Sequence, residues 1–360
     1  MSDSLERILK RIAPLDISAM TAAQLRQDSL TKPVGSLGRL EELSIQIAGI
    51  KGEVPPKLER KIIITMAADH GVVAEGVSLY PEEVTRQMVI NFLKGGAAIN
   101  VLANQVGAQV IVVDMGVKGG FPPLPGLICK MIDFGTKNMV REPAMSRPQA
   151  IEAIEMGIQI VEMEMSKKPD IIGTGDMGIG NTTASSAIFA AISGNPVKKI
   201  TGRGTGIDDR QLDHKMKVIK KALATNKPNP EDSIDVLAKV GGFEIGGLAG
   251  VMLAGAAYRI PVVIDGFISG AAALIATGLS PLVKDYLIAA HVSAEVGHEL
   301  LLNFLGLKPL LNLNMRLGEG TAAALGIFLA EAAVKLLEQM ATFDEAGVSK
   351  AKSTPNRQGI

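Results

Sequence analysis

A single carboxylate lies between two glycines late in the chain, in the sequence Arg316-Leu-Gly318-Glu319-Gly320-Thr. The glycines leave space for a ligand to touch the carboxylate, and an apolar segment with the pattern of a helix follows. A helix N-terminus favours the ionised carboxylate, whereas burial beside an apolar ligand raises its pKa. Glu319 is therefore a candidate general base; the alternative is an acidic residue that only begins a helix.

A glycine-rich segment after a strand-like run is suited to an anion. The segment from Gly173 to Gly178 has the spacing G-x-G-x-x-G, which is found in dinucleotide sites. Such a site also needs an acidic residue about 20 positions further on, and the sequence SGNPVKK near that point contains none. The helix start at Asn181–Thr183 favours a phosphate instead; the alternative is a tight turn with an ordinary cap.

A second glycine-rich segment, Thr201-GRGTGIDD, contains Arg203 and precedes a helical pattern that carries Lys215. Its glycines would let the backbone close on a phosphate or a ribose, and the lysine could reach a phosphate. The sequence has no Walker A motif, GxxxxGK[ST]. Two such loops predict one mononucleotide-like ligand that is not ATP.

Composition narrows the class of protein. The 360 residues are 47% hydrophobic and 21% charged, which predicts a globular protein with a sizeable core. Lys+Arg and Asp+Glu are both 37 and aromatics are 3%, which argues against nucleic-acid binding. The only cysteine, Cys129, excludes a disulfide framework, and His291 and His298 lack the HExxH spacing, so no metal site is predicted. We expect a cytoplasmic protein without a membrane span, because the apolar stretches 245–258 and 266–283 are typical of buried helices.

Five short β-branched runs, each followed by a polar or glycine-rich turn and a helical pattern, predict the elements that position these groups. The runs begin at Lys61, Gln109, Asp170, Ile260 and Tyr286. The alternation predicts an α/β, Rossmann-like parallel sheet flanked by helices. Ligands of such sheets bind at the carboxyl ends of the strands. Polar residues and glycines gather there, at Asp69-His70-Gly71, Asp114, 173–181, Asp265-Gly266 and His291-Val-Ser293.

The two ends of the chain carry helical patterns that are separate from this alternation. Residues 1–55 and 321–341 are predicted to pack together as a small helical subdomain. Residues 56–320 then form the large α/β catalytic domain. The polar segment 342–360 is predicted to be a flexible tail.

Six motifs occur in an order that is characteristic of a known family. They are Lys32-PVGSLGRLEEL, Ala68-DHGV with Glu75-GVSLYPEEVTRQMV, Gly175-DMGIGNTTAS, Thr201-GRGTGIDD, Asp265-GFISGAAALIA and Leu313-NMRLGEGTAAAL. Over essentially its whole length the chain resembles the nicotinate-nucleotide:dimethylbenzimidazole phosphoribosyltransferases, which make the lower-ligand nucleotide of cobalamin. The resemblance implies transfer of phosphoribose from nicotinate mononucleotide to 5,6-dimethylbenzimidazole, giving α-ribazole 5′-phosphate and nicotinate, without a cofactor or metal.

The resemblance also implies roles for individual residues. The family's RLGEG motif gives Glu319 the role of general base, and the expected displacement inverts the anomeric carbon. The residues that the resemblance implies for base binding are Ser78, Tyr80, Gln87 and Met88. Nucleotide binding falls to a larger set: Gly175, Asp176, Gly178, Asn181, Thr182, Gly202, Arg203, Gly204, Thr205, Lys215, Asp265, Gly266 and Ser293.

One position departs from the family pattern, because several members carry Glu where this chain has Asp176. The family forms homodimers, so a homodimer is implied here. Two hypotheses from other classes stay open at this point: a nicotinamide-dependent oxidoreductase using Gly173–Gly178, and a non-catalytic nucleotide-binding protein with the same fold. The first requires tight binding of NAD or NADP, and the second requires that Glu319→Gln changes nothing.

Overall fold

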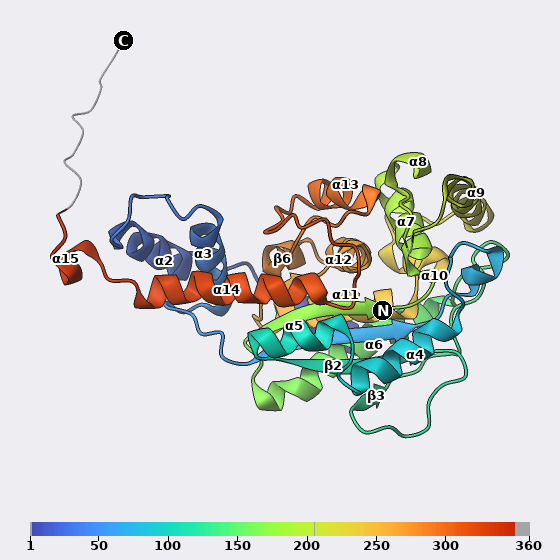
Figure 1. The fold of residues 1–360 in the computed structure, drawn as a ribbon, viewed down its shortest axis with the longest axis horizontal. Helices are drawn as coiled ribbons and strands as arrows, with labels where there is room; N and C mark the ends of the chain where they lie inside the picture. Colours follow the sequence, from blue (N-terminus) through green and yellow to red (C-terminus); the bar gives the residue numbers. More distant parts are fainter. Residues whose placement is uncertain (1, 205, 350–360) are drawn as a thin grey trace, which may run out of the picture. The chain divides into compact units, whose positions relative to one another are not determined.

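A parallel sheet lies at the centre of the large unit in the computed structural model, which describes residues 2–204 and 206–349 (Figure 1). In these residues the sheet has six strands in the order β3-β2-β1-β4-β5-β6, and every neighbouring pair is parallel. The strands are β1 (Lys61–Ala68), β2 (Ala108–Gly116), β3 (Leu127–Cys129), β4 (Ile171–Met177), β5 (Val262–Ile264) and β6 (Leu287–Ala289). This arrangement confirms the predicted Rossmann-like α/β fold.

The edge strand β3 is the one strand of the described sheet that the sequence did not predict. It has only three residues, and none of them is buried, so it lacks the apolar run that marks the other strands. Strand β1, by contrast, is buried at every position after Lys61. Central strands of a parallel sheet are covered on both faces, which explains their continuous β-branched runs.

Helices and short 3₁₀ segments connect the strands and cover both faces of the sheet (Figure 1). Those of the large unit are α1 (Asp3–Arg11), η1 (Gly71–Glu75), α4 (Glu83–Leu93), α5 (Ala98–Val106), α6 (Arg147–Glu164), η2 (Met165–Lys167), α7 (Asn181–Ser193), α8 (Val197–Ile200), α9 (Asp209–Asn226), α10 (Ser233–Val240), α11 (Phe243–Ala257), α12 (Phe267–Leu279), η3 (Pro281–Tyr286), α13 (Val296–Leu305) and the first part of α14 (Thr321–Gln339). Met66 faces α11 on one side of β1, and Ile63 faces the start of α14 on the other.

Helix α11 is buried along its whole length, which explains why its sequence is apolar on all sides. It packs so closely on α6 that glycine is required at the contact. A Cβ atom on Gly157 would lie 1.9 Å from the carbonyl oxygen of Gly247, and one on Gly250 would lie 1.9 Å from that of Ile154. In the part of the chain that the structure describes, no helix has both the length and the hydrophobicity needed to span a bilayer.

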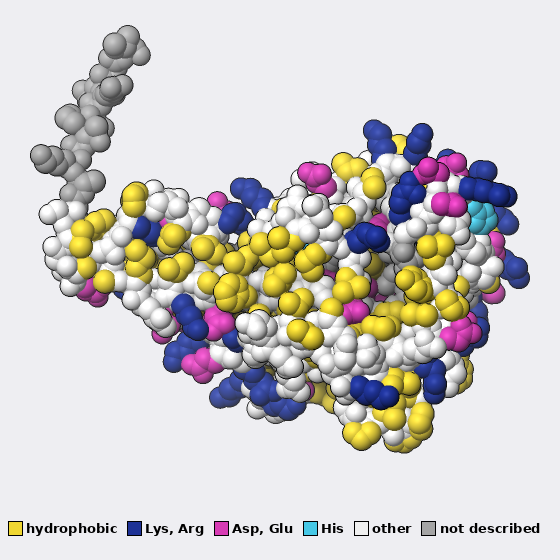
Figure 2. Space-filling view, viewed as in Figure 1, with side chains coloured by type: hydrophobic (Ala, Val, Ile, Leu, Met, Phe, Trp, Pro, Cys, Tyr) yellow, Lys and Arg dark blue, Asp and Glu magenta, His cyan; other side chains and the backbone are white. Residues whose placement is uncertain are grey.

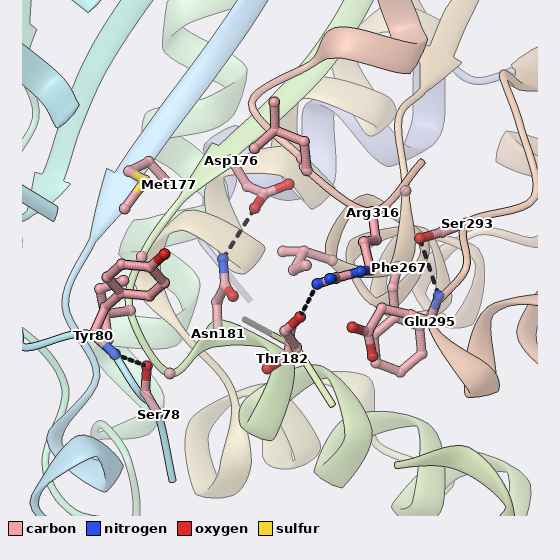
Figure 3. Close-up of a pocket in the computed structure, with 18 of the residues that line it drawn as sticks. Ser78, Tyr80, Asp176, Met177, Asn181, Thr182, Phe267, Ser293, Glu295 and Arg316 are labelled. Atoms are coloured by element: carbon pink, nitrogen blue, oxygen red, sulfur yellow. Dashed lines mark hydrogen bonds between the residues drawn. The ribbon is translucent and has the colours of Figure 1, made fainter. Parts of the chain in front are cut away.

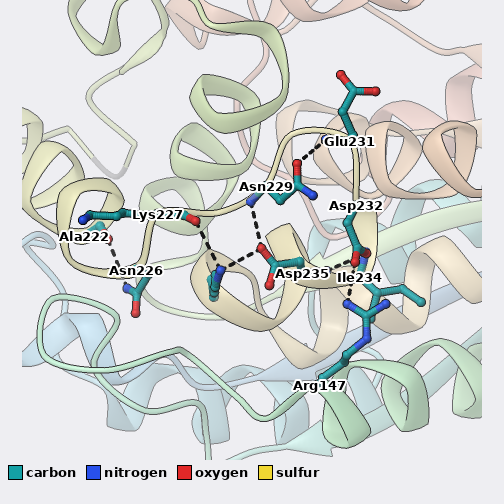
Figure 4. A network of polar contacts seen from close by, with 10 residues as sticks. Arg147, Ala222, Asn226, Lys227, Asn229, Glu231, Asp232, Ile234 and Asp235 are labelled. Carbon is teal, nitrogen blue, oxygen red and sulfur yellow. Dashed lines mark hydrogen bonds and ion pairs between the residues drawn. The ribbon is translucent and has the colours of Figure 1, made fainter.

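A polar network orders the proline-rich loop between α9 and α10 (Figure 4). The Asp235 carboxylate accepts the backbone N–H of Asn229 at 2.8 Å and the Lys239 ammonium at 2.9 Å. Arg147 of α6 donates to Asp232 at 2.7 Å, and Asp232 also accepts backbone N–H groups at the start of α10. These contacts join the start of α6 to α10.

The chain divides into two compact units, Met1–Pro14 with Leu58–Leu329 and Leu15–Lys57 with Ala330–Ile360. The small unit contains α2 (Ile17–Ser29), α3 (Arg39–Lys51), the second part of α14 and α15 (Phe343–Ala346). Its core includes Ala23, Ala48 and Leu337.

These limits differ from the expected ones at three places. Helix α1 belongs to the large unit, where Leu5 and Ile8 are buried. Helix α14 is shared between the units, with the limit after Leu329. The predicted tail contains α15, and its remaining segment 350–360 lies outside the described residues.

We expect Gly157→Ala to destabilise the protein, although alanine is favoured over glycine inside a helix by about 1 kcal/mol. The added methyl group meets backbone atoms of α11, which cannot rotate away, so we expect a net loss of about 1–3 kcal/mol in the free energy of unfolding. Denaturant unfolding measures it. The control is Glu152→Ala on the exposed face of the same helix, which should stay within about 0.5 kcal/mol of wild type; a Gly157→Ala variant of unchanged stability would contradict the tight contact.

Candidate functional site

A pocket of about 360 Å³ opens at the carboxyl ends of the central strands, where ligands of such sheets are expected (Figure 3). This volume falls in the usual range for small-molecule sites, roughly 300–1,000 Å³. Its walls come from segments that are far apart in the sequence. One side is formed by 77–80 after β1, by 176–182 from the end of β4 to the first turn of α7, and by Gly204 and Lys215. The other is formed by 266–268 at the start of α12, by His291, Ser293 and Glu295 after β6, and by 316–318 before α14.

Lys215 supplies a buried positive charge to this pocket. Its ammonium donates to the Thr182 hydroxyl at 2.8 Å and to the Gly202 carbonyl at 3.4 Å, and only 1% of the residue is exposed. Burial lowers the pKa of Lys215 to about 8, against the opposing effect of the Glu295 charge. A Cβ atom on Gly204 would lie 2.9 Å from the Thr182 hydroxyl and 3.3 Å from the ammonium, so glycine leaves this cation accessible.

Two further features make the same region attractive to an anion. Helix α7 begins at Asn181 with Gly180 as its N-cap, and no side chain caps its first turn. The N–H groups of Asn181 and Thr183 already donate to the carbonyls of Gly178 and Gly180, but the dipole of the helix N-terminus still favours negative charge. Arg316 reaches the pocket from the opposite segment and donates to the Gly204 carbonyl at 2.8 Å. Lys215, Arg316 and the start of α7 thus bring two cationic side chains and a helix N-terminus to one pocket.

Asp176 lies at the end of β4 and also lines the pocket. Its Oδ2 accepts the Asn181 amide at 3.0 Å, as Figure 3 shows, while its buried Oδ1 has no hydrogen-bond partner among the described residues. Burial, followed by the charges of Asp265, Glu244 and Glu319, raises the pKa of Asp176 well above its usual range. The neighbouring carboxyl groups therefore add to the effect of burial in disfavouring the charged form of Asp176.

The backbone of Glu319 is held in the left-handed region with φ +65°, between Gly318 at +85° and Gly320 at +100°. Its N–H donates to the carbonyl of Asp176 at 3.2 Å, and its carbonyl accepts the Thr65 hydroxyl at 2.9 Å. Such a backbone costs energy in a residue with a side chain, so neighbouring contacts must hold it.

The side chain of Glu319 is 5% exposed, and burial raises the pKa of its carboxyl group. One oxygen accepts the N–H of Ile99 in the first turn of α5 at 3.3 Å, which opposes that shift. Leu317 and Gly318 line the pocket, whereas Glu319 does not. Glu319 thus directly follows the pocket lining in the sequence, and the raised pKa of its carboxyl group suits a general base.

Asp265 is placed differently from its predicted role in nucleotide binding. It does not line the pocket. Its Oδ1 accepts the N–H groups of Ala322 at 2.7 Å and Ala323 at 3.0 Å, and its Oδ2 accepts that of Gly320 at 3.1 Å. Burial raises the pKa of Asp265 to about 7, although these three hydrogen bonds oppose the shift. Both oxygens of Asp265 are therefore engaged by the start of α14.

The structure brings together many of the predicted site residues. Those that line the pocket are Ser78, Tyr80, Asp176, Gly178, Asn181, Thr182, Gly204, Lys215, Gly266 and Ser293. Those that do not are Glu319, Gly175, Gly202, Arg203, Asp265, Gln87 and Met88. Thr205 lies outside the described residues.

Local contacts explain why several of the predicted residues do not line the pocket. Gly175 backs the Glu319 turn, since a Cβ there would lie 2.2 Å from the Glu319 carbonyl. Arg203 bonds to the Ile207 carbonyl and pairs with Asp209, so its guanidinium is turned along its own loop. Gln87 lines a separate hollow with Asp69, Glu82, Glu83, Arg86, Lys118 and Gly119.

Glu295 and His291 also line the pocket. His291 was predicted to lie at a strand end where ligands bind but was given no role, and Glu295 was not singled out. Glu295 Oε2 and His291 Nδ1 are buried and have no partner in residues 2–204 and 206–349, as expected for atoms that meet a ligand. Burial lowers the pKa of His291 to about 4, so the ring is neutral. A Cβ on Gly202 would lie 1.8 Å from Glu295 Oε2. The signal in the sequence that could have identified Glu295 was its position two residues after the predicted site residue Ser293.

The buried side chains of His70 and Glu244 form a pair that packs against the loop before α7. His70 Nε2 and Glu244 Oε1 are 2.7 Å apart, and both residues are almost fully buried. Burial lowers the pKa of His70, but the charge and hydrogen bond of Glu244 together with the charge of Asp69 outweigh it, so the net shift is upward. A Cβ on Gly178 would lie 3.4 Å from this ring. Among the described residues, no group of His, Cys, Asp and Glu side chains has the arrangement of a metal site.

Comparison with known proteins identifies the family of the chain. A family model described as phosphoribosyltransferase matches residues 12–348. A nicotinate-nucleotide–dimethylbenzimidazole phosphoribosyltransferase of Desulforudis audaxviator is 60% identical and covers 98% of this chain and 99% of its own, and one of Roseiflexus sp. is 62% identical and covers 96% and 98%. The crystal structure of CobT from Thermus thermophilus is 45% identical, with a TM-score of 0.90 over 93% of this chain and 100% of that one.

Proposed function

The chain belongs to the nicotinate-nucleotide–dimethylbenzimidazole phosphoribosyltransferase family, and we propose that it transfers phosphoribose from nicotinate mononucleotide to 5,6-dimethylbenzimidazole with Glu319 as the general base. The products are α-ribazole 5′-phosphate and nicotinate. The observation that supports this proposal is the Gly318-Glu319-Gly320 turn: Gly318 lines the pocket, and the residue after it carries a buried carboxyl group of raised pKa.

The nucleotide occupies the part of the pocket that is rich in donors. Its phosphate lies against Lys215, Arg316 and the start of α7, where the positive charges converge. Its ribose lies toward the segment after β6. There, Ser293 and the unpartnered atoms of His291 and Glu295 supply polar contacts for hydroxyl groups. A neutral imidazole and a carboxylate suit a ribose better than a second phosphate.

The acceptor base occupies the other end of the pocket. Ser78 and Tyr80 lie there, and Met177 adds apolar surface (Figure 3). An aromatic heterocycle needs an apolar slot with one or two polar groups, which this wall supplies. Gln87 and Met88 of α4 lie outside this wall, so we assign the base contacts to Ser78 and Tyr80.

The chemistry follows from these positions. One ring nitrogen of the base donates its lone pair to the anomeric carbon, and the bond from that carbon to the nicotinate ring nitrogen breaks. The bonding electrons return to the nicotinate ring, which was a cation and leaves neutral. The proton on the second nitrogen of the base becomes acidic and passes to Glu319. Attack opposite the departing ring inverts the anomeric carbon, so a β-nucleotide becomes an α-nucleotide.

The position of Glu319 is consistent with a general base that contacts the substrate only when the substrate is bound. Its carboxylate follows the pocket-lining Gly318 and is held by the N–H of Ile99. Hydrogen bonds of general bases are often long without substrate and tighten when substrate is bound. The raised pKa lets this carboxylate accept a proton more readily than an exposed one.

Removing the base should abolish most of the turnover. In Glu319→Gln we expect kcat to fall by about 10²–10⁴-fold, because general-base catalysis is lost while the pocket stays intact. Chromatographic measurement of α-ribazole phosphate, with nicotinate mononucleotide and dimethylbenzimidazole as substrates, gives the rate. Glu299→Gln, an exposed carboxylate on α13, is the matched control. A near-wild-type rate for Glu319→Gln would reject Glu319 as the base.

Lys215 should govern nucleotide affinity. Lys215→Ala removes a charged donor, so we expect the KM for nicotinate mononucleotide to rise by about 10–100-fold. In wild type the ammonium is charged below its pKa of about 8, so the contribution of Lys215 to affinity should be lost as the pH rises through this value. Lys217→Ala, on the exposed face of the same helix, should leave KM unchanged. A change in kcat alone would speak against a phosphate contact.

We also propose that the chain forms a homodimer. Figure 2 shows hydrophobic side chains gathered over α14 and α5, and on these helices Phe328 and Val101 are 56% and 65% exposed. Exposed apolar patches of this kind mark protein contacts. Light scattering after size-exclusion chromatography should give twice the chain mass of 37.8 kDa, and Phe328→Asp should shift the mass toward the monomer. A wild-type monomer would exclude the dimer.

A further inference from the structure

We propose that Asp265 is a positioning residue for the reaction, whose carboxylate holds the first turn of α14 and thereby the turn that carries Glu319. This inference rests on the proposed role of Glu319 as the base. It replaces the expected contact between Asp265 and the nucleotide, because Asp265 lies outside the pocket lining and both of its oxygens are engaged elsewhere.

The contact is a helix cap supplied from a distant strand. Asp265 follows β5 directly and is 1% exposed. Helix α14 begins at Thr321, so the N–H groups of Ala322 and Ala323 belong to its first turn, which has no acceptors of its own within the helix. The Asp265 carboxylate accepts both of them and also the N–H of Gly320. One carboxylate thus joins β5 to the residue that directly follows Glu319.

Three neighbouring strands hold the turn at three consecutive points. Strand β4 accepts the N–H of Glu319 through the Asp176 carbonyl, and β1 donates the Thr65 hydroxyl to the Glu319 carbonyl. The Asp265 carboxylate at the end of β5 accepts the next N–H, that of Gly320. A left-handed residue that is not glycine persists only when its surroundings over-determine it. Without Asp265 the third support is lost, and Glu319 can relax toward ordinary dihedral angles.

Burying the charged form of Asp265 is energetically unfavourable, so we infer that this carboxylate does more than cap a helix. A serine or asparagine caps a helix well, yet this site buries a carboxylate close to the carboxyl groups of Asp176 and Glu319. An asparagine here would offer one acceptor oxygen and would turn its NH₂ group toward an N–H donor. Only a carboxylate presents two acceptor oxygens to three converging N–H groups.

The first test is Asp265→Asn in the full chain. A misplacement of about 1 Å costs about 10²-fold in rate, so we expect a kcat loss of that order. The KM for nicotinate mononucleotide should stay within twofold, because Asp265 does not contact the pocket. A large rise in KM with unchanged kcat would show a nucleotide contact and overturn the proposal.

The matched control is Asp114→Asn. Asp114 is also fully buried near the end of a strand, β2, and its carboxylate accepts the N–H groups of Gly116 at 3.0 Å and Val117 at 2.8 Å. It lines no part of the pocket. A purely structural effect of losing a buried cap should appear in both variants, whereas the loss of kcat should be confined to Asp265→Asn.

A double variant separates this inference from the proposed function. If Asp265 acts through Glu319, then Asp265→Asn with Glu319→Gln should be no more than twofold slower than Glu319→Gln alone, because coupled residues are not additive. A fast Glu319→Gln enzyme would reject the proposed base. A slow Glu319→Gln enzyme together with a fast Asp265→Asn enzyme, or with additive losses in the double variant, would reject only the positioning role.

Asp265→Glu keeps the proposal testable if the asparagine variant does not fold. It retains the charge and moves the carboxylate outward by one methylene group, which breaks the match to the three N–H groups. We expect a loss of kcat similar to that of Asp265→Asn, at unchanged KM, in protein whose circular dichroism matches wild type. A wild-type kcat in Asp265→Glu would show that charge alone suffices and would overturn the positioning role.

Discussion

Three backbone N–H groups converge at the start of α14 in a part of the protein that is closed to water, and the fold around the site depends on giving them an acceptor. Asp265 provides it from the end of β5. An unmet N–H in such a place would cost about 1–3 kcal/mol. Because one carboxylate serves the whole group, the position of α14 is tied to the register of the sheet. The turn before α14, and with it Glu319, takes its place from the strands.

Electrostatics then divide the site into two ends. Asp176 lines one part of the pocket, with Asp265 and Glu319 buried nearby. Burial raises the pKa values of all three carboxyl groups, and neighbouring carboxyl groups raise those of Asp176 and Asp265 further. Lys215 and Arg316 belong to the part that faces the start of α7. This division matches the two proposed substrates: the nucleotide brings a phosphate to one end, and the acceptor base releases a proton at the other. The same environment that makes the carboxyl groups poor anions makes Glu319 a better proton acceptor.

Close approach of backbones is the second constraint, and it accounts for several of the glycines. Gly175 lets β4 lie against the Glu319 carbonyl, Gly202 leaves room for the Glu295 carboxylate, and Gly204 leaves room for the Lys215 ammonium. A side chain at any of these positions would occupy the space of a functional group. The glycine-rich segments therefore shape the pocket even where, as at Gly175 and Gly202, they do not line it.

The sequence by itself determined the parallel sheet, the strand ends at which the pocket lies and the family, because β-branched runs, glycine spacing and ordered motifs are local properties of the chain. It also marked Lys215 and Asp176, which do line the pocket. Only the tertiary structure decided that Asp265 turns to α14, that Gln87 lines a separate hollow, and that Glu295 and His291 face the pocket. The direction of a side chain at a strand end depends on which acceptors and donors the neighbouring strands and helices bring within about 3 Å of it. That information is not in its own segment.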